Sequence, residues 1–181
     1  MVPMLRALYI HIPFCAGRCG YCNFYSGEPL EFMEDYPMWV LREAEIRAEA
    51  WPGPLSSVYL GGGTPALLGV QRVGRILGGI GRHWDLEANA EITVEVNPSS
   101  GADLKDLRRT GVNRLSVGVQ ALDDRLLEWL GRRHDARTAL ETLSRATAAG
   151  FEKVSADILY GVPGLRWTDR DQGLEVERVP E

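Results

Sequence analysis

The sequence is poor in cysteine and has no long apolar run. Its 181 residues include three cysteines, all within one stretch of eight positions, so a disulfide framework spread over the chain is excluded. No run reaches the roughly 18 apolar residues of a membrane span, and a strand-like segment begins almost at Met1. We therefore expect neither a membrane span nor a signal peptide. The protein is predicted to be cytoplasmic, with membrane contact only through a partner.

An excess of positive charge is also missing. Lys and Arg number 20 against 25 Asp and Glu, which gives a net charge of −5. Nucleic-acid binding driven by charge is therefore not expected. Hydrophobic residues make up 45% and charged residues 25%, which is ordinary for a folded domain and excludes a disordered chain.

Five short apolar segments rich in β-branched residues predict strands. They lie at residues 5–12, 57–60, 91–96, 114–119 and 154–159. Helices are expected at 35–50, at 103–110, directly after Asp123 as N-cap, and at 135–149. On the last of these helices, the predicted buried face consists of Ala136, Leu140, Leu143 and Thr147.

Strands that alternate with helices predict an α/β fold with a parallel sheet. The phosphate fingerprint of a doubly wound sheet is missing after the first strand, and polar residues gather at the carboxyl ends of the strands. We therefore expect a partial TIM-type (β/α) barrel, truncated after about five strands, with an exposed sheet edge. Residues 1–164 are assigned to this incomplete barrel, and 165–181 to a divergent or frame-disrupted C-terminal tail.

The three cysteines form a C-x3-C-x2-C pattern, Cys15, Cys19 and Cys22, directly after the first strand. Thiolates bind iron–sulfur clusters, which normally take four of them. With three, one iron would be left open to another ligand. The alternative is a structural zinc site of the Cys3His type that uses His11, although its spacing is atypical.

The loop and its surroundings resemble the radical S-adenosylmethionine (SAM) superfamily. The words YIHIPFC, GGGTP, VEVNP, GVNRLSVGVQ, LGRRH and DILYGVPG are similar to its anaerobic coproporphyrinogen III oxidase-like family, and together they cover residues 5–164. The resemblance implies a radical SAM core with a [4Fe-4S] cluster held by Cys15, Cys19 and Cys22. It also implies that SAM binds the open iron and that an electron from a one-electron reductant yields a 5′-deoxyadenosyl radical.

The resemblance also implies which residues bind the cofactors. Taken one by one, each could equally be structural, as a turn glycine, a strand aromatic or a solvated charge. Arg132 is preferred over its neighbour Arg133 by its spacing from Gln120, and His134 is expected to be a surface histidine. The implied cofactor-binding residues are Tyr9, Tyr21, Gly62, Gly63, Thr64, Glu95, Gln120, Arg132 and Asp157.

Within this family the chain is most similar to the HemW-like heme chaperone subgroup. The oxidases carry a fourth cysteine two residues after the third, where this chain has Phe24, and they have an additional N-terminal segment. The resemblance to the chaperones implies heme binding and transfer of heme to acceptor proteins. The alternatives are an oxygen-independent coproporphyrinogen III oxidase of porphyrin biosynthesis, which is a coproporphyrinogen dehydrogenase-type oxidoreductase, and a zinc-binding scaffold. Whether the protein is an enzyme is left open.

Overall fold

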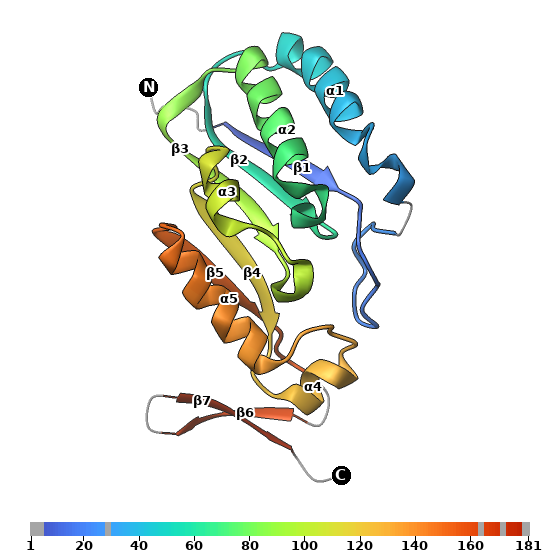
Figure 1. Cartoon of the computed structure of the whole chain (residues 1–181), viewed down its shortest axis with the longest axis vertical. Helices are drawn as coiled ribbons and strands as arrows, with labels where there is room; N and C mark the ends of the chain where they lie inside the picture. The colour runs from blue at the N-terminus through green and yellow to red at the C-terminus, as the bar shows by residue number, and fades with distance from the viewer. Residues whose placement is uncertain (1–5, 28–29, 163–164, 171–172, 179–181) are drawn as a thin grey trace.

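A five-stranded parallel sheet dominates the structure, a computed structural model that describes residues 6–27, 30–162, 165–170 and 173–178 (Figure 1). The strands lie side by side in chain order. They are β1 (Ala7–Ile12), β2 (Leu55–Gly62), β3 (Leu86–Val96), β4 (Arg114–Gln120) and β5 (Lys153–Ile158). All five predicted strands are present, and β2 and β3 are longer than expected.

The strand order decides between the two α/β architectures. A doubly wound sheet reverses its order at a switch point, whereas this sheet runs β1-β2-β3-β4-β5 without reversal. Because crossovers between parallel strands are right-handed, an unreversed order brings the connecting helices to the same face. Figure 1 shows the helices together on one side of the sheet. The expected α/β fold with a parallel, partial-barrel sheet is confirmed.

In the described ranges, five α-helices and three 3-10 helices connect the strands. The α-helices are α1 (Tyr36–Ala50), α2 (Gly69–His83), α3 (Leu104–Arg109), α4 (Asp124–Trp129) and α5 (Ala136–Ala148). The 3-10 helices are η1 (Leu30–Met33), η2 (Pro65–Leu68) and η3 (Pro98–Ser100). The carboxylates of Asp103, Asp123 and Asp135 accept backbone N–H bonds at the starts of α3, α4 and α5. Asp123 is thus an N-cap, as predicted, and Asp103 and Asp135 are N-caps as well.

Helix α2 was not anticipated from the sequence. It contains five glycines, which individually disfavour helix. Its buried residues include Val73, Ile76, Leu77 and Ile80, which recur at helical spacing and pack into the core. Gly79 faces α1, where a Cβ would collide with the Leu41 side chain, so this glycine permits the close contact of the two helices.

The two faces of the sheet differ completely in chemistry. One register row, Ile10–Leu60–Val94–Leu115–Val154, belongs to the hydrophobic core under the helices. The row one residue earlier, Tyr9–Tyr59–Thr93–Arg114–Lys153, lies on the opposite face. We call these the outer and inner faces. Burying each large outer-face side chain contributes about 1.5–3 kcal/mol to folding.

The buried side of α5 differs from the prediction. Ala139, Thr142 and Ala146 are buried, whereas Leu140 is 51% exposed. Small side chains face the sheet because they let the helix backbone pack close to it. The prediction was right for Leu143, which packs against the core, and wrong for Leu140, because it followed side-chain size.

The C-terminal segment forms an antiparallel hairpin of β6 (Leu165–Arg170) and β7 (Gly173–Arg178). The strands pair only with each other in the described part of the chain. The expected strand start at residue 5 and the boundary at residue 164 lie outside the described residues, and the division into core and tail stays a prediction. Within the described ranges, no helix combines the length and apolarity needed to cross a membrane.

Candidate functional site

A cavity of about 620 Å³ opens at the carboxyl ends of the strands, between the cysteine loop and the inner face. It collects nearly all the predicted site residues. Those that line it are Cys15, Cys19, Tyr21, Cys22, Gly62, Gly63, Thr64, Glu95, Gln120, Arg132 and Asp157. Residues more than 140 positions apart in the sequence thus share one site.

Tyr9 is the predicted residue that does not line this cavity. It lines a second cavity of about 610 Å³, between β1 and α1, which holds none of the other predicted site residues. Its ring stacks on that of Tyr59 with centroids 5.9 Å apart, and its hydroxyl lies 3.2 Å from His11 Nδ1. Tyr9 therefore borders the site through Tyr59.

Backbone hydrogen bonds close the base of the cysteine loop. The Cys15 N–H donates to the Gly27 carbonyl at 2.9 Å, and the Gly27 N–H donates to the Pro13 carbonyl at 2.9 Å. Arg133 Nη1 donates to the Ala16 carbonyl at 2.8 Å from the opposite wall. Arg133 thus binds the loop backbone, whereas Arg132 lines the cavity.

The three thiols are unpaired and half-buried. Cys15 Sγ lies 3.7 Å from Thr64 Oγ1, and Cys19 Sγ lies 3.7 Å from Arg132 Nη1. Two of the three sulfur atoms therefore have a hydrogen-bond donor beside them on the cavity wall. A thiolate cluster with donors to its sulfur atoms is the environment that iron–sulfur sites use.

The zinc alternative does not match the arrangement of its four ligands. Among the described residues, which include His11 and all three cysteines, no group of three His, Cys, Asp or Glu side chains could hold one metal ion. His11 Nε2 instead lies 2.7 Å from the Tyr25 carbonyl oxygen. An iron–sulfur cube binds each thiolate at a different iron, so it does not require the sulfur atoms to meet at one point.

The glycines at the end of β2 let its backbone lie close to the backbone that follows β1. Gly63 and Thr64 donate their N–H groups to the carbonyls of Ile12 and Phe14 at 2.8 and 2.7 Å. A Cβ at Gly63 would collide with the Phe14 carbonyl, and Gly62 has φ +120°, a conformation that side chains rarely adopt. Only glycine fits here, and the loop leaves its cavity side open to a ligand.

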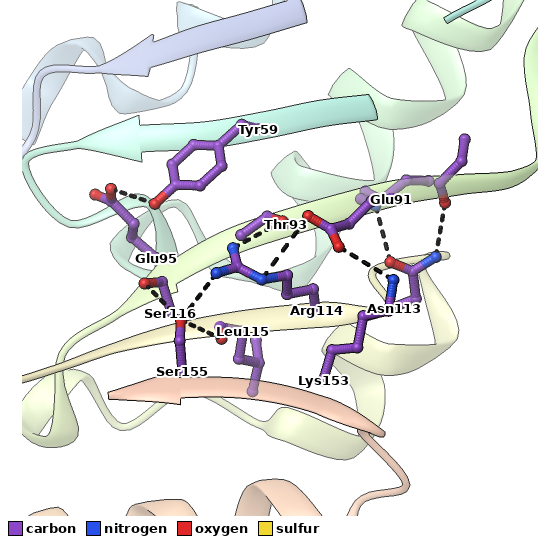
Figure 2. Close-up of polar contacts among 12 residues, drawn as sticks. Tyr59, Glu91, Thr93, Glu95, Asn113, Arg114, Leu115, Ser116, Lys153 and Ser155 are labelled. Atoms are coloured by element: carbon purple, nitrogen blue, oxygen red, sulfur yellow. Dashed lines mark hydrogen bonds and ion pairs between the residues drawn. The ribbon is translucent and has the colours of Figure 1, made fainter. Parts of the chain in front are cut away.

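Glu95 has the partners that a largely buried carboxylate needs. One oxygen accepts from the Tyr59 hydroxyl at 2.8 Å (Figure 2). The other accepts from the Gly62 N–H at 2.9 Å. Burial raises the pKa of Glu95 above its ordinary value, against the lowering effect of these two hydrogen bonds. Burial and the neighbouring carboxylate raise the pKa of Tyr59 to about 12, so its hydroxyl stays a donor.

Asp157 and Gln120 are placed by the neighbouring ends of β5 and β4. Ser116 Oγ donates to Asp157 Oδ1 at 2.9 Å. Gln120 is the one described non-glycine residue with positive φ, 66°, and the pairing of β4 with β5 shifts register between Val117 and Gln120. A left-handed residue beside a register shift is typical of strain held at a functional site.

Arg132 brings a positive charge to the cavity without a carboxylate partner. Its Nη2 donates to Asn97 Oδ1 and to the Gly118 carbonyl, both at 2.7 Å. Its Nε is buried without a hydrogen-bond partner, and the described residues hold no ion pair with it. This arrangement suits an anionic ligand group, such as a carboxylate, that would compensate the charge.

His134 lies in the interior, so the expectation of a surface histidine was wrong. It is 6% exposed, and its Nε2 lies 3.1 Å from the Val119 carbonyl oxygen. Burial lowers its pKa. The neutral ring therefore serves the packing behind β4 and does not reach the cavity.

Sequence reasoning missed two residues that hold the site together, Tyr59 and Asn97. Tyr59 supports Glu95, and Asn97 links Thr64 to Arg132. Asn97 lies within the VEVNP word, but its role becomes visible only when β2, β3 and the loop after β4 come together. Its position directly before a proline was the available signal.

The inner face stays polar on the side of the sheet away from the cysteine loop. Arg114 Nη2 donates to Ser155 Oγ at 3.0 Å, and its Nε lies 3.8 Å from Glu91 (Figure 2). Lys153 contacts the same Glu91 at 3.2 Å. Two cations thus share one carboxylate at this end of the inner face, whereas Arg132 at the cysteine end has no carboxylate partner among the described residues.

Comparison with known proteins gives a consistent result. A family model described as the radical SAM superfamily matches residues 9–175. The bovine protein named radical S-adenosyl methionine domain-containing protein 1, mitochondrial, is 38% identical over 175 residues, which cover 93% of this chain and 40% of that protein. The heme chaperone HemW of Lactococcus lactis is 35% identical, covering 91% of this chain and 43% of that protein. The chain thus spans about two fifths of the length of these relatives.

A solved structure shows the same fold. The coproporphyrinogen III oxidase HemN from Escherichia coli, described as a radical SAM enzyme, superimposes with a TM-score of 0.77 at 29% identity. The match covers 88% of this chain and 38% of that one. The similarity in fold therefore extends over most of this chain.

Proposed function

The chain belongs to the radical SAM superfamily, and from that membership we propose that it binds a [4Fe-4S] cluster and SAM in the cavity and handles heme as a HemW-like chaperone. One observation carries the proposal. The loop that carries the three cysteines, the glycine loop of Gly62, Gly63 and Thr64, and the ends of β3, β4 and β5 converge on a single cavity. This convergence is what binding of the two cofactors side by side requires.

Cys15, Cys19 and Cys22 would hold the cluster. Their loop is closed at its base and carries hydrogen-bond donors to two of its sulfur atoms. Three thiolates leave one iron of a cube without a protein ligand, which is where the amino and carboxylate groups of SAM would bind. A cluster held there would supply the one-electron chemistry that cleaves the sulfonium bond of SAM.

The other cavity residues would bind SAM. The open side of Gly62, Gly63 and Thr64 would receive its amino group. Arg132 would receive its carboxylate, which compensates the charge that the protein leaves free. Further along the sheet edge, the ribose and adenosyl portions would contact residues at three strand ends, which are Glu95, Gln120 and Asp157.

Heme handling is supported by the relatives. HemW proteins of several bacteria, among them Lactococcus lactis, are named heme chaperones. Phe24 lines the cavity at the position of the oxidases' fourth cysteine and is 65% exposed. The proposal includes a heme-acceptor protein and a one-electron reductant as partners, and a cytoplasmic location.

Anaerobic reconstitution with iron and sulfide tests the cluster. We expect a brown chromophore whose iron and sulfide contents match, and its loss in Cys15→Ser, Cys19→Ser and Cys22→Ser. Ser26→Ala, a change of similar size in the same loop, should keep the chromophore. A preparation that contains zinc but neither iron nor sulfide would contradict the proposal.

The second candidate, an oxygen-independent coproporphyrinogen III oxidase, is supported by the structural similarity to HemN. Two assays on the reconstituted protein separate the candidates. We expect a heme absorbance change on titration with heme, followed by transfer of heme to an apo-acceptor. Formation of protoporphyrinogen IX from coproporphyrinogen III, SAM and a reductant would instead establish the oxidase.

A further inference from the structure

Asn97 occupies the junction between the three walls of the cavity. It follows the last residue of β3 and precedes Pro98, which restricts it to extended backbone. Its φ and ψ are −89° and 139°. The proline therefore fixes the direction in which the Asn97 side chain leaves the strand, across the cavity floor.

The two ends of the Asn97 amide have different partners. Nδ2 donates to Thr64 Oγ1 at 2.8 Å, and Oδ1 accepts from Arg132 Nη2 at 2.7 Å. The orientation of the amide is unambiguous because a guanidinium carries donors only, so the oxygen must face Arg132. Asn97 thus bonds to one residue after β2 and one after β4.

Each of these partners has a cysteine beside it. Thr64 Oγ1 lies 3.7 Å from Cys15 Sγ, and Arg132 Nη1 lies 3.7 Å from Cys19 Sγ. Asn97 contacts neither sulfur. Two hydrogen-bond chains that begin at one amide therefore end on two of the three cysteines.

The amide determines the direction of both chains. A hydroxyl has one hydrogen, and because Thr64 accepts from Asn97, that hydrogen is left for Cys15. An amide oxygen is neutral, so Arg132 is bonded without losing its charge, which stays available to Cys19. A carboxylate at position 97 would reverse both effects, since it would attract the threonine hydrogen and pair with the guanidinium.

The backbone at Gly118 leaves room for this arrangement. A Cβ at Gly118 would lie 2.9 Å from Asn97 Oδ1 and 3.3 Å from Arg132 Nη2. The first distance is too short for a side chain at this position, and the second is tight. Gly118 therefore keeps open the space in which the amide meets the guanidinium.

We propose that Asn97 is a positioning residue that, before SAM binds, aims one hydroxyl hydrogen and one uncompensated positive charge at the sulfur atoms of Cys15 and Cys19. This inference rests on the proposed function, because it concerns a cluster bound by these cysteines. Hydrogen bonds to sulfur and nearby positive charge both favour the more negative, reduced state of an iron–sulfur cluster. Asn97 thereby raises the reduction potential of the cluster without touching it.

The near-isosteric variant Asn97→Asp tests this role by anaerobic redox titration of the cluster, read by electron paramagnetic resonance. We expect the equilibrium constant for reduction to fall about tenfold, which is about 59 mV for one electron. Because the resonance comes only from bound cluster, incomplete loading does not alter the potential. Asn89→Asp, an exposed position on the same strand, adds the same charge far from the cavity and should leave the potential unchanged.

Thr64→Val provides a second test that changes no charge. It removes the hydroxyl hydrogen beside Cys15, so the potential should fall by less than in Asn97→Asp. In the double variant the potential should shift by less than the sum of the two single-variant shifts, because both changes remove the same hydrogen bond. If Asn97→Asp does not fold, an unchanged potential in Thr64→Val would by itself contradict the inference.

The outcomes separate the inference from the proposed function. A wild-type chain that binds no iron–sulfur cluster would overturn both. A wild-type cluster whose potential is unchanged in Asn97→Asp and in Thr64→Val would overturn the role of Asn97 alone. Strictly additive shifts would show that Asn97 acts by its charge only and not through Thr64, which would also contradict the inference.

Discussion

The inner and outer faces of the sheet are built from alternate residues of the same five strands, yet they carry different tasks. On β4, Leu115 is fully buried under the helices, while its neighbour Ser116 bonds to Asp157 on the inner face. The outer face is apolar in every strand, and the inner face holds hydroxyls, carboxylates and guanidinium groups. The difference teaches that stability and ligand binding can be changed separately, one residue apart.

The largest effect is expected from cutting into the outer face. Leu115→Ala leaves a cavity in a site that is 0% exposed, and should lower the free energy of unfolding by about 2–5 kcal/mol. Ser116→Ala, on the inner face, loses hydrogen bonds to groups that water can reach and should cost about 1 kcal/mol. Urea unfolding of both variants measures the contrast, and equal losses would contradict the separation of the faces.

The next largest effect on stability is expected from replacing a glycine beside the cavity, compared with a glycine on the helices that cover the outer face. Gly63→Ala places a methyl group against the Phe14 carbonyl and should cost about 1–3 kcal/mol and separate the glycine loop from the cysteine loop. Gly78→Ala, in open space on α2, should stabilise the chain by about 0.5–1 kcal/mol. Unfolding curves and iron content distinguish the two, since Gly63→Ala alone should lose iron.

The pH dependence of stability sharpens the comparison further, because the inner face buries a titratable group. A raised pKa means that folded Glu95 binds its proton more tightly than unfolded Glu95 does, so its contribution to stability declines as pH rises from about 4.5 through the raised pKa. Glu95→Gln lacks this decline. The stability of the variant relative to wild type should therefore increase over that interval and then level off, as measured by urea unfolding in a pH series. A constant difference would show that Glu95 is not buried as described.

The smallest effect concerns the strained residue at the end of β4. Gln120→Gly removes the cost of a left-handed side chain, and should stabilise the free chain by no more than about 1 kcal/mol, because glycine also loosens the unfolded state. Gln71→Gly, at an exposed position of α2, should cost about 1 kcal/mol instead. Thermal unfolding of both variants checks the opposite signs.

All five strands of the parallel sheet could be predicted from the sequence, whereas one helix could not. Each strand was predictable because it is a short run of apolar residues that ends at a polar residue or a glycine. Helix α2 was missed because five glycines argue against a helix, while its stability comes from Val73, Ile76 and Ile80 packing on the sheet. The buried side of α5 was misjudged for a related reason, since close approach favoured Ala139 and Ala146 over leucine.

Candidate site residues could be predicted from the sequence where the residue type itself indicates a chemical role. Three clustered cysteines and a carboxylate inside an apolar strand are such signals, and Glu95 does have the partners that burial demands. Supporting residues announce nothing by type. Asn97 and Tyr59 act through partners that lie more than 30 positions away in the chain, so only the assembled sheet reveals them.

The closed base of the cysteine loop has a consequence for how metal enters the protein. The hydrogen bonds among Pro13, Cys15 and Gly27 order the ends of the loop while the polypeptide folds. The entropy lost in ordering these ends is then spent before any metal arrives. Insertion of the proposed cluster would thus resemble binding to a preformed site more than a folding reaction.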